Sequence, residues 1–320
     1  MFISIVTPCY NVSSFLDDYF DSLFSQTHHD FEIILVDDGS KDNTWEKLHE
    51  FQQKDSRIRI YQLETNSGGC KIPRETAISH ANSDWIVAVD ADDFLDKDYL
   101  EKLVNRQVET SADLVYSRTI LWSPEKQELT IPDKEFDFSQ ILSSENALDL
   151  CVGGWKISSS GALVRKTLIT NSHNYLQKAK LLGRDNLDEL TSREVIIGAN
   201  RLAFADTNYY ARINMSSVTR SNPRQFYTYG TDLDLYHLLK HHYGAESLIT
   251  RKALTAYISH IMRIVRKGEQ INEDILNHLS MLKNKDIWNS SLSFNRKIRT
   301  TLRLHHLKRK YGTINQEIKG

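Results

Sequence analysis

Three aspartates, Asp90, Asp92 and Asp93, directly follow the apolar run 85–89. Such a run is typical of a buried strand, and open α/β sheets bind ligands just outside the carboxyl ends of their strands. Mg²⁺ and Mn²⁺ are commonly held by one or two carboxylates together with phosphate oxygens of a substrate. The cluster therefore predicts a divalent cation beside a bound phosphate. An acidic turn that caps the following helix would contain the same residues, and this alternative stays open.

Three further polar clusters follow other apolar runs. In the first, 7–11 (Thr-Pro-Cys-Tyr-Asn), the tyrosine could stack on a base. In the second, 37–40 (Asp-Asp-Gly-Ser), a carboxylate could accept a hydrogen bond from uracil N3–H or a ribose hydroxyl. An ordinary turn with a helix cap would explain either cluster equally well.

The third cluster is 66–69 (Asn-Ser-Gly-Gly), which Pro73 and Arg74 follow. Two glycines allow a ligand to approach the backbone closely. An arginine on the next helix offers a forked donor to a diphosphate. A structural salt bridge is the alternative for this arginine.

Length and composition are those of a folded globular protein. The chain has 320 residues, of which 40% are hydrophobic and 26% charged. No apolar run approaches the roughly eighteen residues that cross a bilayer, and the start lacks the basic region of a signal peptide. The three cysteines have no metal-like spacing. We therefore expect a cytoplasmic protein without a disulfide framework or a zinc site.

The net charge of −2 conceals an asymmetry. Residues 1–120 contain 22 acidic and 11 basic residues, whereas residues 291–320 contain eight Lys or Arg and one Glu. An acidic half of the chain binds an anionic nucleotide poorly unless a metal ion supplies positive charge. The asymmetry therefore favours a metal ion at the aspartate cluster.

The elements that must position these clusters alternate along residues 1–121. Strands separated by helical patterns of about a dozen residues indicate βαβ units and a mainly parallel sheet, with the strand ends gathered at one edge. The pattern predicts strands at 2–6, 31–36, 57–63, 85–89 and 113–121, and helices at 13–26, 43–54, 71–82 and 97–110.

The pattern is looser after residue 122. It predicts an extended segment at 122–138, helices at 144–152 and 185–198, a strand passing into a helix at 161–170, and strands at 203–205 and 209–213. The chain reads as helical after 223. We expect a catalytic domain at 1–220 and a helical C-terminal region at 221–320.

The order and spacing of the four clusters resemble the inverting glycosyltransferases of family 2. The matching stretches are 6–11, 35–44, 66–69 with 73–74, and 89–93. The resemblance is to the type that builds bacterial capsule, teichoic acid and other surface polysaccharides. It implies an α/β GT-A nucleotide-diphospho-sugar transferase fold, a mainly parallel open sheet flanked by helices, here with a helical C-terminal extension.

The resemblance also implies roles for individual residues. Pro8 and Tyr10 would line the base site, Asp38 would read uracil or ribose, and Arg74 would contact the diphosphate. Mn²⁺ or Mg²⁺ would bind Asp92, with Asp93 and Asp90 supporting the metal ion and the sugar nucleotide. The full set of implied substrate-binding positions is Pro8, Tyr10, Asn11, Asp37, Asp38, Gly69, Arg74, Asp90, Ala91 and Asp92.

In such enzymes the catalytic base is usually the aspartate of a Gly-Glu-Asp triplet that opens a helix. The nearest match here is 183–185, so the resemblance implies Asp185 as the base, with Arg184 where glutamate is usual. A plain helix cap is the alternative for Asp185, and Asp188 and Glu189 are the next candidates. The base would take the acceptor proton while the metal ion and Arg74 offset charge on the departing diphosphate.

The implied partners are a nucleotide-sugar donor, UDP-linked for preference, and a glycan or lipid-linked saccharide acceptor. The basic amphipathic segment 294–310 could lie on an anionic membrane surface, or it could pack as an ordinary terminal helix. Peripheral attachment at the inner face of the cell membrane is thus compatible with a cytoplasmic enzyme. The basic residues are not interleaved with stacking aromatic residues, so we expect no nucleic-acid partner.

Two other functions stay open on the sequence. A sugar nucleotidyltransferase should have a glycine-rich phosphate loop after the first strand, and 7–11 contains no glycine. A non-catalytic sugar-nucleotide or glycan-binding module would bind nucleotide without turnover. Processive synthases carry membrane spans and a Gln-x-x-Arg-Trp motif that this sequence lacks, which favours non-processive transfer.

Overall fold

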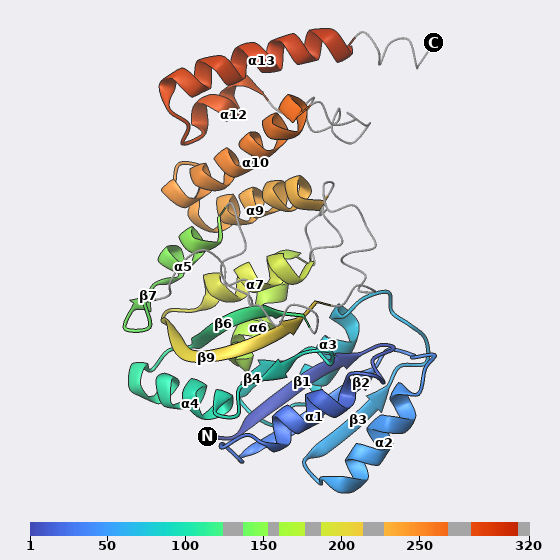
Figure 1. Cartoon of the computed structure of the whole chain (residues 1–320). Helices are drawn as coiled ribbons and strands as arrows, with labels where there is room; N and C mark the ends of the chain where they lie inside the picture. The colour runs from blue at the N-terminus through green and yellow to red at the C-terminus, as the bar shows by residue number, and fades with distance from the viewer. Residues whose placement is uncertain (124–136, 153–159, 177–186, 214–226, 268–282, 313–320) are drawn as a thin grey trace. The chain divides into compact units, whose positions relative to one another are not determined.

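The computed structural model describes residues 1–123, 137–152, 160–176, 187–213, 227–267 and 283–312. Within these ranges the chain forms two compact units. The first contains the strands and helices α1 to α7, and the second contains helices α9 to α13 (Figure 1). The boundary expected near residue 220 falls in 214–226, outside the described residues, and so does most of the extended segment expected at 122–138.

The first unit is built on one sheet with the strand order β3-β2-β1-β4-β8-β6-β9-β5, in which β7 also pairs with β9. Strands β1, β2, β3, β4, β6 and β9 run in one direction, and the short strands β5, β7 and β8 run against them. The bounds are β1 Ile3–Cys9, β2 Phe31–Asp37, β3 Ile58–Gln62, β4 Trp85–Ala88, β5 Phe94–Leu95, β6 Leu114–Trp122, β7 Ile141–Leu142, β8 Leu163–Arg165 and β9 Leu202–Arg212.

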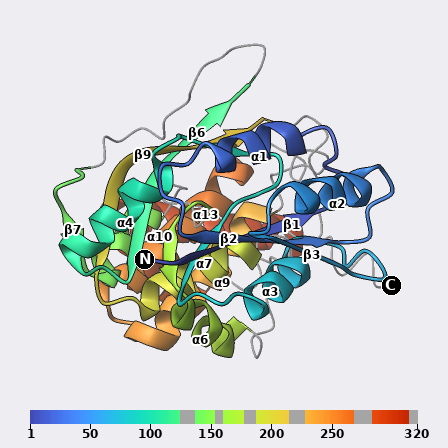
Figure 2. The same ribbon diagram turned by 90° about the horizontal axis from the view of Figure 1, so that it is seen from below.

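Helices cover both faces of this sheet (Figure 2). Every residue of β1 and β2 is buried, which explains why these strands read as continuous apolar runs without alternation. Helices α1 Leu16–Phe24, α2 Thr44–Lys54 and α4 Tyr99–Thr110 share one hydrophobic core with the sheet, and α3 Lys71–Ser79 and α6 Lys166–Leu176 pack on the opposite face. Helices α5 Ser144–Cys151 and α7 Leu187–Gly198 complete the unit.

Helix α1 shows how the sequence directs this packing. Leu16, Tyr19, Phe20 and Leu23 are completely buried, at the spacing of one helix face. The ring of Phe20 stacks on Phe51 of α2 with 4.0 Å between centroids. The two helices are therefore fixed to each other as well as to the sheet.

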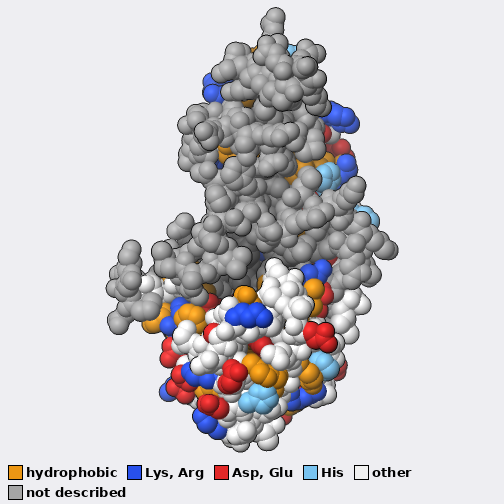
Figure 3. Space-filling model, turned by 90° about the vertical axis from the view of Figure 1, so that its right-hand side faces the viewer, with side chains coloured by type: hydrophobic (Ala, Val, Ile, Leu, Met, Phe, Trp, Pro, Cys, Tyr) orange, Lys and Arg blue, Asp and Glu red, His pale blue; other side chains and the backbone are white. Residues whose placement is uncertain are grey.

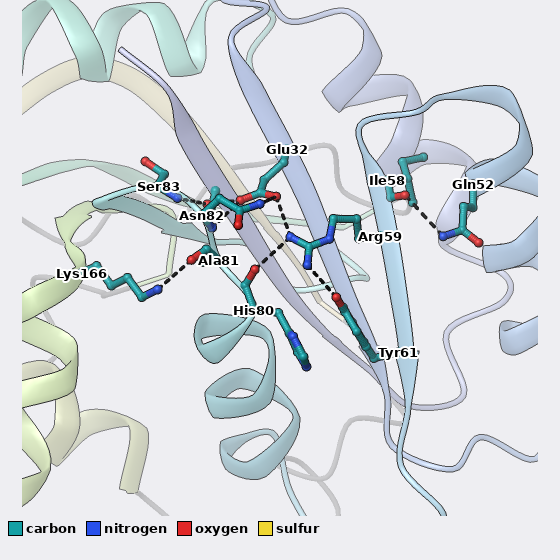
Figure 4. Close-up of polar contacts among 11 residues, drawn as sticks. Glu32, Gln52, Ile58, Arg59, Tyr61, His80, Ala81, Asn82, Ser83 and Lys166 are labelled. Carbon is teal, nitrogen blue, oxygen red and sulfur yellow. Dashed lines mark hydrogen bonds and ion pairs between the residues drawn. The ribbon is translucent and has the colours of Figure 1, made fainter.

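The N-terminal edge of the sheet is held by a buried acid, Glu32, at the start of β2 (Figure 4). Its carboxylate accepts hydrogen bonds from Ser4 Oγ at 2.6 Å, from the backbone and side chain of Asn82 at 2.7 and 2.9 Å, and from Arg59 at 2.9 Å. Burial raises the pKa of Glu32, but these hydrogen bonds outweigh it, and the pKa is lowered overall. The network joins β1, β2, β3 and the turn before β4.

Strand β9 is longer than the two short strands expected at 203–205 and 209–213. The segment 206–208 between them belongs to the strand: Thr207 is 1% exposed, and the backbone and side chain of Asn208 donate to Asp96 at 2.9 and 2.8 Å. These hydrogen bonds to Asp96 hold Asn208 inside one continuous strand.

The second unit is helical, with α9 Tyr227–Tyr243, α10 Leu248–Lys267, α12 Asn284–Asn289 and α13 Phe294–Gly312. Its core includes Tyr257 and Ile261 of α10, Ile287 of α12 and Leu304 and Leu307 of α13. In the described part of the chain, no helix combines the length and apolarity that crossing a bilayer requires.

Candidate active site

The first two polar clusters lie side by side because β1 and β2 are parallel neighbours with Cys9 opposite Asp37. The backbone N–H of Asn11 donates to Ser40 Oγ at 2.9 Å, and the Asn11 amide oxygen accepts from the backbone of Lys41 at 2.7 Å. Asn11 has φ of 53°, a left-handed conformation that asparagine tolerates better than most residues. The two turns after β1 and β2 are therefore joined.

Asp38 joins the second cluster to the third. Its side chain is 2% exposed and accepts hydrogen bonds from Asn66 Nδ2 at 3.1 Å, Ser67 N at 2.9 Å and Ser67 Oγ at 3.0 Å. A carboxylate offers about four lone-pair positions, so these donors leave room for about one more. Asp37 next to it is also buried and accepts hydrogen bonds from Ser40 of the same loop and from Gln62 at the end of β3.

Arg74 joins the third cluster to the fourth. It lies on α3, and its Nη2 is 3.0 Å from Asp90 Oδ1. The arginine side chain is 17% exposed and the Asp90 side chain 35% exposed, so both remain accessible to a ligand. The hydroxyl of Ser160 lies 3.5 Å from the other oxygen of Asp90. The salt bridge named above as the alternative for Arg74 is thus present, and its partner is itself a candidate site residue.

Asp93 faces the protein interior. It is 6% exposed, its Oδ2 accepts from the hydroxyl of Tyr209 at 2.5 Å, and its Oδ1 accepts from the backbone of Arg212 at 2.8 Å. Burial, together with the nearby carboxylates of Asp90 and Asp92, raises its pKa well above the ordinary value. Both oxygens of Asp93 are therefore used inside the protein.

Asp92 differs from Asp93 because its side chain is half-buried. Among the described residues, no three His, Cys, Asp or Glu side chains converge as a set of metal ligands. A single accessible carboxylate still fits Mg²⁺ or Mn²⁺, since these ions commonly take one or two carboxylates and complete their shell with water and phosphate oxygens. Asp92 is the residue that best fits this role, with Asp90 beside it.

The remaining predicted positions differ in exposure. Tyr10 is 43% exposed, and Gly69 is exposed as well, whereas Pro8 is buried within β1 and Ala91 is 2% exposed. Tyr10 is therefore the one of these side chains best able to stack on a base. Asp185, Arg184 and the rest of 177–186 lie outside the described residues, and α7 begins just after them at Leu187.

Cys9 lies among these groups but is not equipped for nucleophilic chemistry. It is 1% exposed, and burial, with the carboxylates of Asp37, Asp90 and Asp92, raises the pKa of its thiol well above the ordinary value. The thiolate is the reactive form of cysteine, so this side chain serves packing.

Three residues of this edge received no role from the sequence: Ser160, Tyr209 and Arg212. The sequence predicted a strand at 209–213, and the hydrogen bonds of Tyr209 and Arg212 show that the end of β9 reaches the aspartate turn. Asn66 and Ser67 were seen as part of a ligand loop, and the structure shows that they also bind Asp38.

The four clusters thus form one continuous series of contacts at the carboxyl edge of the sheet. A model of the family described as "Glycosyl transferase family 2" matches residues 4–171, which include all four clusters. The chain belongs to glycosyl transferase family 2. Among curated members of the family, it is similar to the glycosyltransferase GlyG of Streptococcus pneumoniae, with 29% identity over 221 residues, 68% of this chain and 73% of GlyG.

Two further relatives have names that refer to polymers. The putative teichuronic acid biosynthesis glycosyltransferase TuaG of Bacillus subtilis is 32% identical over 146 residues, 46% of this chain and 56% of TuaG. The poly(ribitol-phosphate) beta-N-acetylglucosaminyltransferase TarP of Staphylococcus aureus is 23% identical over 237 residues, 70% of this chain and 68% of TarP. The chain thus spans between about half and three quarters of the length of these three relatives.

Solved structures confirm the fold of this family 2 glycosyltransferase. Residues 1–349 of Staphylococcus aureus TarS in complex with UDP-GlcNAc match with a TM-score of 0.65 and 18% identity, over 90% of this chain and 81% of that one. A mannosyltransferase of Pyrobaculum calidifontis in complex with GDP-Man and Mn²⁺ matches with a TM-score of 0.51 and 14% identity, over 97% of this chain and 87% of that one. The predicted GT-A fold with a helical C-terminal region is therefore confirmed.

Proposed function

We propose that this glycosyltransferase transfers a sugar from a UDP-sugar to a hydroxyl group of a surface glycan or lipid-linked oligosaccharide, by a single inverting displacement. The observation that carries the proposal is the series of contacts from Asn11 through Asp38 and Arg74 to Asp90, which brings four polar loops to one edge of the sheet. UDP-GlcNAc in TarS and the polymer names of TuaG and TarP support the substrate classes.

The donor would lie across these loops with its base toward Tyr10 and its diphosphate toward Arg74. An exposed aromatic ring suits stacking on uracil, and the remaining lone-pair position of Asp38 suits its N3–H. Asn11, Asp37, Gly69 and Ala91 would shape the path of the donor through their backbones and turns. Arg74 would bind the diphosphate through its guanidinium group.

We assign a divalent cation, Mn²⁺ or Mg²⁺, to Asp92, with Asp90 in support. When bound, this ion would supply positive charge to the departing nucleoside diphosphate. The Mn²⁺-bound mannosyltransferase of the same fold is consistent with such a site. Because both oxygens of Asp93 bind Tyr209 and Arg212, its predicted part in metal binding would be indirect.

Asp185 remains the proposed base, which would accept the proton of the attacking hydroxyl. Asp185→Asn should abolish transfer and leave UDP affinity within about twofold of the wild type, because UDP would bind at the other loops. Titration calorimetry with UDP and a transfer assay measure the two effects separately. A fully active variant would assign the base to another residue, with Asp188 and Glu189 next to be tested.

Peripheral membrane contact is proposed through the charge of α13 rather than by insertion. Leu304 and Leu307 are buried in the core of the second unit, while Arg296, Arg299 and Arg303 are exposed on the helix surface. Each basic residue near an anionic membrane contributes roughly 1 kcal/mol. Exchange of the three arginines for glutamine should release the protein from phosphatidylglycerol vesicles, and unchanged binding would reject this contact.

A panel of UDP-, GDP- and dTDP-sugars tests the proposal as a whole. Incubation of each donor with the protein and Mn²⁺ should release the nucleoside diphosphate slowly in the absence of acceptor, and fastest from one UDP-sugar. Nucleotide binding without any release, with or without a glycan acceptor, would favour the non-catalytic module instead.

A further inference from the structure

Strand β9 ends on the aspartate turn and makes several contacts with it. Arg212 makes two of them: its backbone N–H donates to Asp93 Oδ1 at 2.8 Å, and its Nε donates to the carbonyl oxygen of Asp92 at 3.0 Å. Its Nη2 also pairs with Asp18 of α1 at 2.6 Å. One residue thus holds the main chain of Asp92, the side chain of Asp93 and the neighbouring helix.

Tyr209 holds the same turn from the other side. Its hydroxyl accepts from the backbone N–H of Asp90 at 3.1 Å and donates to Asp93 Oδ2 at 2.5 Å. The side chain of Tyr209 is completely buried. The turn is therefore fixed at Asp90, Asp92 and Asp93.

The guanidinium of Arg212 is itself held in place. Its central carbon lies 4.6 Å from the ring centroid of Trp122, 5.4 Å from that of Phe15 and 5.6 Å from that of Phe94. These distances are within the range of cation–π attraction. With only 10% of its side chain exposed, Arg212 has little freedom to turn toward a ligand.

We propose that Arg212 and Tyr209 are positioning residues for the donor site. They keep the 90–93 turn in the conformation in which Asp92 is half-buried and Asp93 is buried and hydrogen-bonded to both of them. This inference rests on the proposed function of Asp92 as the metal-binding carboxylate. It assigns to the end of β9 a part in donor binding without contact with the donor.

Mn²⁺ and UDP affinity test this role directly. In Arg212→Ala, the affinity for Mn²⁺ in the presence of UDP, measured by electron paramagnetic resonance, should fall roughly 10- to 100-fold, as when outer-shell partners of metal ligands are removed. Arg212→Lys can donate to the carbonyl of Asp92 and should recover part of the loss. Tyr209→Phe should weaken Mn²⁺ binding in the same direction.

Arg106→Ala is the matched control. Arg106 of α4 also donates from its Nε to a backbone carbonyl of β9, that of Phe204, at 3.1 Å, but far along the strand from the aspartate turn. Its removal should leave Mn²⁺ affinity and the KM for the donor unchanged, whereas Arg212→Ala should raise that KM and lower kcat. Thermal melting compares the loss of stability in Arg212→Ala with that in Arg106→Ala.

These measurements distinguish failure of the positioning role from failure of the metal assignment. If Arg212→Ala binds Mn²⁺ as the wild type does, or loses affinity only as Arg106→Ala does, the positioning role is wrong and the proposed function stands. If the wild type itself binds UDP equally well with and without Mn²⁺, the metal assignment is wrong, and the positioning role fails with it.

Discussion

Arg74 of helix α3 and Asp90 of the acidic turn meet at the carboxyl edge of the sheet, with 3.0 Å between Nη2 and Oδ1. The pair connects the helix after the Asn-Ser-Gly-Gly loop to the first aspartate of the acidic turn. Both side chains are partly exposed, so water reaches the pair and the ion pair alone contributes little to stability. Its position therefore suits ligand binding better than fold stabilisation.

Removal of the Arg74 side chain should impair catalysis more than folding. For Arg74→Ala we expect kcat for donor hydrolysis to fall roughly 10²–10³-fold, as for the loss of one donor that stabilises developing charge. Arg74→Lys should recover only part of the rate because an ammonium group cannot bind a diphosphate in the forked manner. Steady-state kinetics of UDP release measure the rates of both variants.

Arg57→Ala serves as the control for this prediction. Arg57 pairs with Asp55 at 2.7 Å just before β3, away from the carboxyl edge. Its loss should leave UDP release unchanged. Equal losses in the two variants would show that the effect of Arg74 is a general loss of structure.

Gly39 should not tolerate a side chain. It has φ of 70°, and a Cβ at this position would lie 3.0 Å from the backbone N of Asn66 and 3.3 Å from the carbonyl carbon of Thr65. Gly39→Ala should lower the free energy of unfolding by roughly 1–3 kcal/mol and weaken UDP binding, because the displaced loop loses its hydrogen bonds to Asp38. Urea denaturation and calorimetry measure the two effects.

Gly244→Ala separates backbone strain from loop displacement. Gly244 has φ of 81°, and a Cβ there would meet nothing within 4 Å. Gly244→Ala should therefore lower the free energy of unfolding through backbone strain alone, and UDP binding should stay normal. Normal UDP binding by Gly39→Ala would contradict the close fit of the two loops.

The network around Glu32 predicts a pH-dependent stability. The pKa of Glu32 is lowered in the folded protein, so its contribution is complete above the unfolded-state pKa and is lost as the pH falls through the folded-state value. At pH 7, Glu32→Gln should lower the free energy of unfolding by roughly 1.5–3 kcal/mol, and the difference should shrink in acid. Urea denaturation across pH 3–7 measures this.

Glu109→Gln is the exposed counterpart, since Glu109 pairs with Arg106 while 69% exposed. Its effect should stay within about 0.5 kcal/mol at every pH. A Glu32→Gln difference that grows toward low pH would show that the folded protein raises the pKa of Glu32 instead.

Much of this architecture follows from local sequence. The strands and helices of residues 1–121 were predicted within a few residues, because apolar runs buried on both faces and one-sided helical spacing are strong signals. The short strands β5 and β7 were missed, since a two-residue strand has no periodicity of its own. The separation of the strands predicted at 203–205 and 209–213 was wrong, because Asp96 accepts two hydrogen bonds from Asn208 within one continuous strand.

The candidate site was predictable in its parts and less so in its connections. The sequence identified the four clusters, and it placed both Asp92 and Asp93 at the metal ion, with Asp93 in a supporting role. The structure separates them, because Tyr209 and Arg212, more than a hundred positions later, bind Asp93 and leave Asp92 half-buried. Such a distinction depends on the strand order, which no local pattern encodes.

The distribution of charge on the surface bears on the acidic excess of residues 1–120, which favoured a metal ion. On the face shown in Figure 3, acidic, basic and hydrophobic side chains of the described residues lie interspersed. The acidic excess of residues 1–120 does not form one continuous acidic patch in this view. The need for a cation is therefore best tested at the aspartate turn itself.

The most direct test compares UDP release from the preferred UDP-sugar by the wild type and by Asp92→Asn, each with Mn²⁺ and with EDTA. Asparagine keeps the size of the side chain but removes the charge that would hold the ion. We predict that the wild type releases UDP only with Mn²⁺ and that Asp92→Asn releases almost none under either condition. Undiminished Mn²⁺-dependent release by Asp92→Asn would contradict the assignment of the cation to Asp92.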